Sequence, residues 1–365
     1  MNSIWIVGRE FFYKDEPWNF PKYIFKTNSA LTYRNQFSQS VSFKMPSTMP
    51  RPPYDLELAP ALAVMNFTPT LTLDLLDFVR EKSAPTSHQA LAGRMVSHEQ
   101  RTIAGPGGDI ILSIIRSSVA TEPSSGNEHP GILYTHGGGM TGGNRFLGIG
   151  TILDWVEEHN AVCVSVEYRL PPQHPDPAPV DDCYAALLWV YENLDNLRID
   201  PDKLLIAGSS AGGGIAAGTA LLSRDRGGPR LCGQVLICPM LDDRNDTISS
   251  HQYVEEGSWS RGSNLFGWTC LLGDRRGGDQ VSIYAAPARA TDLSGLPLAF
   301  IDVGSAEVFR DEAVNYASLL WKFGVQAELH VWAGGFHGFD LLVPNAELSI
   351  VAREVRSKWV RRIFS

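Results

Sequence analysis

The stretch Leu204-Leu205-Ile206-Ala207-Gly208-Ser209-Ser210-Ala211-Gly212-Gly213 decides the fold of this chain. Its apolar first half predicts a short buried strand, and the small residues that follow Gly213 predict a helix. A strand that passes through a tight turn into a helix is typical of a sheet covered by helices.

The turn itself has the pattern Gly-x-Ser-x-Gly, with Ser210 at its centre. Such an abrupt turn strains its central residue, and Gly208 and Gly212 carry no Cβ to obstruct it. We expect it to lift the Ser210 hydroxyl above the carboxyl edge of a sheet and to place the Ala211 N–H at a helix N-terminus. The pattern is also short enough to arise by chance, as a turn of small residues that contains a serine.

Strands and helices alternate along the chain after about residue 97, which predicts the α/β class. Apolar runs predict strands at residues 110–115, 131–135, 161–166, 204–207, 234–238, 298–303 and 327–332. Helical patterns predict helices at residues 151–159, 181–194, 313–323 and 347–363. The alternation predicts a mostly parallel central sheet that is flanked by helices.

The chain is expected to have several parts. Residues 1–54 are rich in aromatic side chains and proline without a clear period, so we assign them to an N-terminal arm. Residues 55–96 have a helical pattern and are assigned to a cap, together with an insert at residues 241–285 that interrupts the strand series. Residues 97–240 and 286–365 form the α/β domain that would carry the active site.

The insert at residues 241–285 begins at the carboxyl end of a strand, where ligands bind in such sheets, so we expect it to cover the site as a lid. The pocket walls would come from it and from residues 55–96. Its Trp259, Phe266 and Trp268 would either line an apolar pocket or form the core of the lid. Both interpretations stay open.

The composition is that of an ordinary soluble globular protein, with 365 residues, 44% hydrophobic and 19% charged. The net charge of −9, which no basic cluster offsets, argues against a nucleic-acid partner. Basic residues near the C-terminus recur at helical spacing and predict a solvated helix face; they are Arg353, Arg356, Lys358, Arg361 and Arg362.

The cysteines indicate a reducing compartment, because none forms a C-x-x-C pair; they are Cys163, Cys183, Cys232, Cys238 and Cys270. Cys163 and Cys238 lie in apolar runs and are expected to be reduced core thiols. The apolar run at residues 4–7 is too short for a signal peptide, and no stretch approaches the length of a membrane span. We therefore expect a cytoplasmic protein.

A serine hydroxyl is a poor nucleophile at neutral pH and needs a base within hydrogen-bond reach. His337 is the favoured base for Ser210, because it follows the strand predicted at 327–332 and lies in a loop with glycines on both sides. His330 lies inside that strand and is expected to be structural.

The base in turn needs a carboxylate to hold its tautomer and to stabilise the imidazolium. Glu307 is the first candidate, since it lies just beyond the strand predicted at 298–303. Asp302 is the alternative, although it still belongs to the strand. The order Ser210, Glu307, His337 is that of α/β-hydrolase triads.

A glycine-rich loop, His136-Gly137-Gly138-Gly139, follows the strand predicted at 131–135. The N–H groups of Gly137 and Gly138, together with that of Ala211, would bind an oxyanion. A phosphate cradle is the rival interpretation, but the chain lacks both a G-K-[ST] ending here and a G-x-G-x-x-G that opens a helix. No His/Cys/Asp cluster has metal-ligand spacing, so neither a metal nor a cofactor is expected.

Several segments, in this order, resemble the hormone-sensitive-lipase-like group of α/β-hydrolases, which comprises the bacterial family IV esterases and their fungal relatives. They are the loop at 136–139, Tyr168-Arg169-Leu170-Pro171-Pro172 with His174-Pro175 and Asp181-Asp182, the turn at 208–213, Phe309-Arg310-Asp311-Glu312, and His337-Gly338-Phe339. The resemblance covers about residues 55–360 and implies the α/β-hydrolase fold, with a cap built from N-terminal helices and an insert.

The resemblance implies a serine carboxylic ester hydrolase that acts on short- to medium-chain acyl esters through an acyl-enzyme. A small-molecule ester is then the partner, and no cofactor is needed. By resemblance the catalytic residues are Ser210, Glu307 and His337, the oxyanion donors are Gly137, Gly138 and Ala211, and the supporting residues are His136, Gly139, Arg169, Asp182, Gly208 and Gly212.

The chain departs from the group's pattern in three places. Ser209 stands where an acidic residue is frequent, Glu307 stands where aspartate is most common, and residues 1–54 have no counterpart. A non-catalytic ligand receptor on the same fold is an alternative function, but such receptors lose the histidine that is present here as His337. A lactonase or an amidase would use the same triad. Relatives often dimerise through the last strand and helix, so a homodimer stays open.

Overall fold

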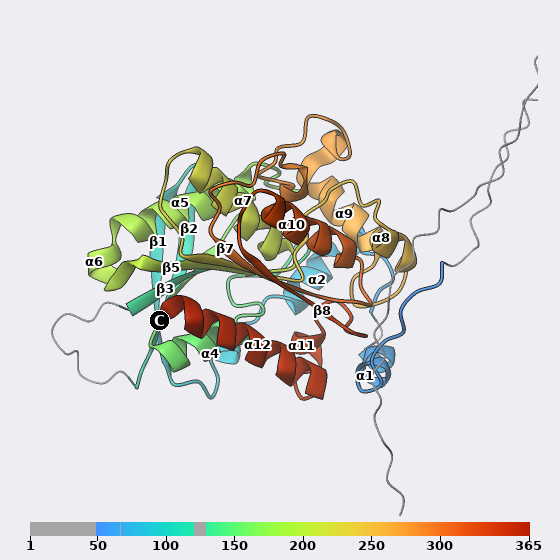
Figure 1. Ribbon diagram of the computed structural model, residues 1–365, viewed down its shortest axis with the longest axis horizontal. Coiled ribbons are helices and arrows are strands. Elements are labelled where there is room, and N and C mark those ends of the chain that lie inside the picture. Colours follow the sequence, from blue (N-terminus) through green and yellow to red (C-terminus); the bar gives the residue numbers. More distant parts are fainter. Residues whose placement is uncertain (1–48, 66, 120–128) are drawn as a thin grey trace, which may run out of the picture. The chain divides into compact units, whose positions relative to one another are not determined.

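The computed structural model describes residues 49–65, 67–119 and 129–365. An eight-stranded sheet with the order β1-β2-β4-β3-β5-β6-β7-β8 forms its centre (Figure 1). Its strands are β1 (Val96–Gly105), β2 (Gly108–Ser117), β3 (His129–Thr135), β4 (Val162–Glu167), β5 (Ile199–Ser209), β6 (Gly233–Ile237), β7 (Leu298–Gly304) and β8 (Ala327–Trp332). The pairs β1–β2 and β2–β4 are antiparallel, and all the others are parallel. The predicted α/β sheet is confirmed.

Helices cover both faces of the sheet (Figure 1). On one face α4 (Gly150–His159) packs against α12 (Glu347–Phe364), and on the other lie α5 (Ala178–Glu192), α7 (Ala211–Asp225) and α10 (Arg310–Lys322). The remaining helices are α9 (Arg261–Leu272) and several short ones of at most eight residues, namely α1 (Leu58–Met65), η1 (Leu73–Leu75), α2 (Leu76–Lys82), α3 (Ser87–Ala90), α6 (Leu194–Leu197), α8 (Ile248–Gln252), η2 (Gly273–Arg275), η3 (Pro287–Arg289) and α11 (Phe339–Leu342).

The central strands are buried on both faces, which explains why apolar runs locate them. All five residues of β6 are buried, as are the first five of β4. A parallel strand between two helical layers has no solvent side, so its sequence does not alternate. The edge strand β1 has no such run, because Ile103 is its only buried residue. The apolar runs therefore do not predict this strand.

Helix α7 follows the Ser210 turn and packs unusually close to the chain around it. A Cβ on Gly214 would lie 2.0 Å from the carbonyl oxygen of Met240, and one on Gly218 would lie 2.0 Å from that of Tyr284. The small residues noted in the sequence therefore allow backbone to meet backbone. This contact fixes the direction in which α7 leaves the turn.

The prediction that the basic residues near the C-terminus form a solvated helix face is wrong for Arg356. Its side chain is only 1% exposed, and its Nε donates a 2.7 Å hydrogen bond to Oδ2 of Asp302. Its Nη1 pairs with the carboxylate of Asp340. One side of helix α12 faces the interior, and Arg356 lies on that side between two buried acids. Lys358 and Arg361 do face the solvent.

Among the described residues, none of the helices combines the length and the hydrophobicity that a membrane span requires. The predicted arm at residues 1–54 lies outside the described residues except for its last six. The division into arm, cap and α/β domain stays a prediction.

Arg356→Met is expected to lower the free energy of unfolding by about 3–5 kcal/mol, because it leaves Asp302 and Asp340 buried without their cation. Lys358→Met, on the same helix, removes only an exposed pair with Glu354 and should change stability by less than about 1 kcal/mol. Urea unfolding followed by circular dichroism measures both. Equal losses in the two variants would contradict a special role for the buried pair.

Candidate active site

The turn at Ser210 has the strained geometry that the sequence predicts. Ser210 lies between β5 and α7 with φ 56° and ψ −122°, a region that residues other than glycine rarely adopt. Its N–H donates a 2.8 Å hydrogen bond to the carbonyl oxygen of Ile237. A Cβ on Gly208 would lie 2.2 Å from the Gly212 oxygen, and one on Gly212 would lie 2.1 Å from the Thr135 oxygen. Both glycines are therefore required by the turn.

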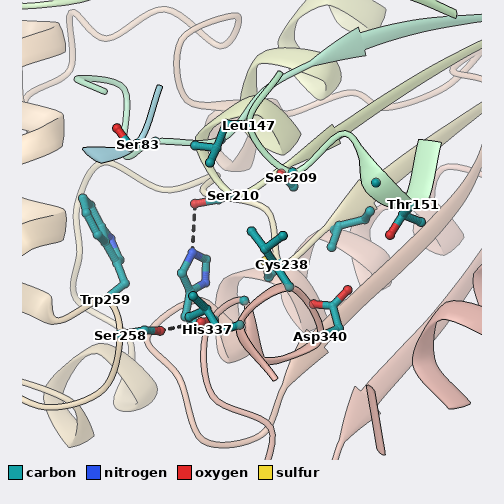
Figure 2. A pocket seen from close by; sticks show the side chains of 18 of the residues that line it. Ser83, Leu147, Thr151, Ser209, Ser210, Cys238, Ser258, Trp259, His337 and Asp340 are labelled. Atoms are coloured by element: carbon teal, nitrogen blue, oxygen red, sulfur yellow. Dashed lines mark hydrogen bonds between the residues drawn. The ribbon is translucent and has the colours of Figure 1, made fainter. Parts of the chain in front are cut away.

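The ends of three parallel strands bring Ser210, His337 and Glu307 into one hydrogen-bonded row. The Nε2 atom of His337 lies 2.9 Å from the Ser210 Oγ, and its Nδ1 lies 2.6 Å from Oε2 of Glu307 (Figure 2 shows the first contact). The other carboxylate oxygen of Glu307 accepts a 2.9 Å hydrogen bond from the Gly304 N–H. Since a carboxylate only accepts, the proton of a neutral His337 lies on Nδ1, and Nε2 is free to accept from the serine.

The alternative acid, Asp302, lies elsewhere. Its Oδ2 accepts hydrogen bonds from Trp332 Nε1 at 2.9 Å and from Arg356 Nε at 2.7 Å. Burial, more than any other influence, raises its pKa. His330 is likewise remote from the row, where it contacts Glu328 at 3.0 Å and stacks on Trp332. The geometry thus pairs Glu307, and not Asp302, with His337.

The imidazole of His337 experiences opposing influences. Burial lowers its pKa, but the neighbouring Cys238 and Glu307 raise the pKa by more, so that the balance lies well above the ordinary value. Phe309 contacts the ring edge-on at 5.0 Å. His337 accepts a proton only in its neutral form, and the neutral fraction grows as the pH rises through this raised pKa.

Cys238 was not predicted to lie at the site. It follows β6, has a φ of 38°, and is buried as expected of a core thiol. However, it also lines the cavity above Ser210. Its Sγ lies within 4.8 Å of a carboxylate oxygen of Glu307 and of an imidazole nitrogen of His337. Cysteine, histidine and glutamate are zinc ligands, but here Glu307 and His337 are already engaged with each other. No local sequence pattern indicates this proximity, because the three residues follow three different strands.

The glycine-rich loop after β3 lies against the serine turn. A Cβ on Gly137 would lie 3.1 Å from the carbonyl oxygen of Ser209. Gly138 has a φ of 121°, and Gly139, with a φ of 60°, leaves only 2.1 Å between an added Cβ and the ring of Trp259. The loop can follow this path only because three successive residues lack side chains.

His136 holds this loop from beneath. Its ring is fully buried and stacks on Tyr168 with 4.1 Å between ring centroids, and the Tyr168 hydroxyl donates a 2.6 Å hydrogen bond to its carbonyl oxygen. Burial lowers the pKa of His136 to about 4, so the ring is neutral at physiological pH. Its Nδ1 donates to the Gly137 carbonyl at 2.7 Å. The supporting role that the resemblance implies for His136 stays a prediction.

Arg169 and Asp182 form a second support, away from the cavity. Nε and Nη2 of Arg169 donate to both oxygens of the buried Asp182, at 2.8 and 2.7 Å. The Arg169 N–H donates to the same carboxylate at 3.0 Å. The pair ties the chain that leaves β4 to helix α5, and neither residue lines the cavity of Ser210.

A cavity of about 580 Å³ opens above the Ser210 row (Figure 2). As predicted, residues 55–96 and the insert both contribute walls, through Phe67, Leu71 and Val79 from the former and Ser258 and Trp259 from the latter. The sequence did not predict the walls from the start of α4 and from the segment after His337, namely Thr151, Asp154, Asp340, Leu341, Leu342, Pro344 and Arg353.

The three aromatic residues of the insert have different positions. Trp259 lines the cavity, whereas Trp268 is fully buried in the core. Phe266 lines a separate surface pocket with Leu73 and Pro172. The prediction of an apolar pocket wall is therefore right for Trp259, and that of a buried core position is right for Trp268. Phe266 fits neither prediction.

Comparison with known proteins identifies the family of the chain. Residues 132–341 match the model of a family described by its alpha/beta hydrolase fold. The carboxylesterase NlhH of Mycobacterium tuberculosis is 36% identical over 257 residues, which span 68% of this chain and 78% of that protein. The chain belongs to the hormone-sensitive-lipase-like group of the alpha/beta hydrolases.

Solved structures of two esterases are similar to this chain along nearly their whole length. A bacterial heroin esterase superposes with a TM-score of 0.77 and 34% identity over 86% of this chain and 98% of that chain. An esterase of Pyrobaculum calidifontis gives a TM-score of 0.74 and 31% identity, over 85% and 99%. Arylacetamide deacetylase of Bos taurus is 30% identical over 57% of this chain and 67% of that protein.

Gly138→Ala is expected to lower ester hydrolysis about 10²–10³-fold, because a Cβ at a φ of 121° would lie 2.0 Å from the Gly142 carbonyl oxygen and displace the loop. Gly150→Ala is the matched control, since Gly150 lines the same cavity but an added Cβ there meets no atom within 4 Å. Hydrolysis of p-nitrophenyl butanoate measures both variants. If the loop had no catalytic importance, Gly138→Ala and Gly150→Ala would hydrolyse the ester at similar rates.

Proposed function

We propose that this hydrolase is a serine carboxylesterase that acts on short- to medium-chain acyl esters through an acyl-enzyme. The observation that carries the proposal is the row Ser210–His337–Glu307, with contacts of 2.9 and 2.6 Å, at the floor of a cavity. Relatives that bear the names carboxylesterase and esterase support it.

In the first step the Ser210 Oγ attacks the ester carbonyl carbon while Nε2 of His337 takes the hydroxyl proton. Glu307 stabilises the imidazolium through its contact with Nδ1. Burial makes this contact strong, since the Glu307 side chain is only 1% exposed. The carbonyl oxygen becomes an oxyanion, which the N–H groups of Gly137, Gly138 and Ala211 would bind.

The tetrahedral intermediate then collapses, and His337 gives its proton to the leaving alkoxide, which departs as the alcohol. Water enters, loses a proton to His337 and attacks the acyl-enzyme. Collapse of the second intermediate breaks the bond to the Ser210 oxygen, which regains its proton as the acid product leaves. The cavity of about 580 Å³ has room for small acyl and alcohol groups on either side of the serine.

Amide hydrolysis is a second candidate function, since the similarity to arylacetamide deacetylase favours it and acyl transfer from an amide uses the same residues. A lactonase would also use this row. A non-catalytic receptor is disfavoured, because ligand binding alone does not require the hydrogen-bonded row of Ser210, His337 and Glu307. The cytoplasmic location and the homodimer stay predictions.

Ser210→Ala should abolish turnover of p-nitrophenyl butanoate and covalent labelling by a fluorophosphonate, because the attacking oxygen is lost. Ser209→Ala is the matched control on the same turn and should keep the labelling. Mass spectrometry of the labelled peptide locates the adduct. A wild-type chain that neither labels nor hydrolyses esters would support the receptor instead.

Glu307→Gln should lower kcat about 10³–10⁴-fold and move the acidic limb of the pH profile to lower pH. The carboxylate helps to raise the pKa of His337, so its loss lowers that pKa, and the ring stays neutral to a more acidic pH. Profiles of kcat/KM against pH for wild type and variant measure the shift.

Asp302→Asn is the control for this variant, since Asp302 contacts Trp332 and Arg356 but not His337. It should leave the position of the acidic limb unchanged. If Asp302→Asn instead moved the limb and Glu307→Gln did not, Asp302 would be the acid.

A further inference from the structure

A carboxylate lies in the wall of the cavity beyond the Ser210 row. Asp340 belongs to α11, three residues after His337, and its residue surface is 8% exposed. It lines the cavity with Thr151 and Leu341. Figure 2 shows it on the other side of Cys238 from Ser210, with the carboxylate turned into the cavity. The proposed catalytic steps do not use it.

Only one oxygen of this carboxylate is engaged. Oδ2 of Asp340 pairs with Nη1 of Arg356, while Oδ1 accepts no hydrogen bond from residues within the described ranges. Arg356 also binds Asp302, so two buried carboxylates share one guanidinium. When both acids are ionised, the group retains one negative charge in excess. The open oxygen in the cavity wall is where a ligand can compensate it.

The other charged side chains that line the cavity, counted with their ion-pair partners, leave the balance of the whole wall negative. Arg94 lines the same cavity, but its Nη2 already pairs with Asp154 at 2.7 Å and with Glu157 at 2.8 Å. Arg353 is a third guanidinium, and it donates to the main-chain oxygens of Asp340 and Pro344. With Arg356, three guanidinium groups thus face four carboxylates, so the balance remains negative.

We propose that Asp340 forms a subsite for a protonated amine on the substrate, whose N–H donates to the open Oδ1. The preferred esters then bear an ammonium group on either the acyl or the alcohol part. The subsite rests on the proposed function, since it selects among substrates of the same Ser210 reaction. A merely structural partner of Arg356 would not distinguish an ammonium group from an apolar group of the same shape.

Two pairs of esters with matched shapes test the subsite on the two sides of the ester bond. Methyl 4-(dimethylamino)butanoate and methyl 5-methylhexanoate differ only in an ammonium or an isopropyl group on the acyl part. The esters 2-(dimethylamino)ethyl butanoate and 3-methylbutyl butanoate differ in the same way on the alcohol part. Acid release in a pH-stat at neutral pH, where the amines are protonated, gives kcat/KM for each ester.

Asp340→Asn should lower the ratio of kcat/KM for the ammonium ester to that for its neutral partner at least about tenfold, in one of the two pairs. Asp302→Asn is the matched control, because it also removes one carboxylate from Arg356 but none from the cavity. Its ratio should stay within about twofold of wild type. The pair that responds identifies the side of the ester bond that reaches Asp340.

The subsite is overturned if the ratio in Asp340→Asn equals that of wild type in both pairs, or if Asp302→Asn lowers it equally. Wild-type protein alone provides a second test, should Asp340→Asn not fold. It must hydrolyse the ammonium ester at least as efficiently as the neutral ester in one pair, and a preference for the neutral ester in both pairs overturns the subsite. Failure of the proposed function is distinguishable, because then no ester of either pair is hydrolysed.

Discussion

The strained backbone at Ser210 is the constraint on which the rest of the site depends. A φ of 56° and a ψ of −122° are unfavourable for serine by roughly 1–3 kcal/mol, so the surroundings must hold them. The carbonyl oxygen of Ile237 accepts a hydrogen bond from the Ser210 N–H, and the main-chain carbonyl oxygen of Ser210 accepts one from the Met240 N–H at 2.9 Å. The last residue of strand β6 and the segment that follows it thus bind both the main-chain N–H and the main-chain carbonyl of Ser210.

The parallel sheet turns this local constraint into a site. Carboxyl ends of adjacent parallel strands lie at one edge, so residues that are distant in the chain meet there. Ser210 follows the end of β5, Cys238 that of β6, Glu307 that of β7 and His337 that of β8. These four strands are adjacent in this order across the sheet. The glycine loop leaves β3 on the other side of β5. The serine therefore lies between its base and the loop.

Features that depend on backbone pattern were predictable from the sequence, and features that depend on side-chain partners were not. The strands from β2 to β8, the turn at Ser210 and the row with His337 follow from apolar runs, glycine spacing and chain order. The position of Arg356 does not, because an arginine with helical spacing has the same pattern whether it faces water or two buried acids. Cys238 and Asp340 enter the cavity through tertiary packing that no local pattern encodes.

The buried cluster around Arg356 links the stability of the fold to the position of the base. Arg356 ties α12 to Asp302 at the end of β7 and to Asp340 in α11. His337 lies two residues before the start of α11, so a shift of that helix would move the imidazole away from its 2.9 Å contact with Ser210. Burying this group of charges is costly, and apolar residues in place of all three side chains would fill the same volume at less cost. The guanidinium, however, donates to two carboxylates on separate elements and neutralises one of their charges, which an apolar residue cannot do. The loop that carries His337 is thereby held from beneath, while glycines on both sides leave its backbone free to follow the turn.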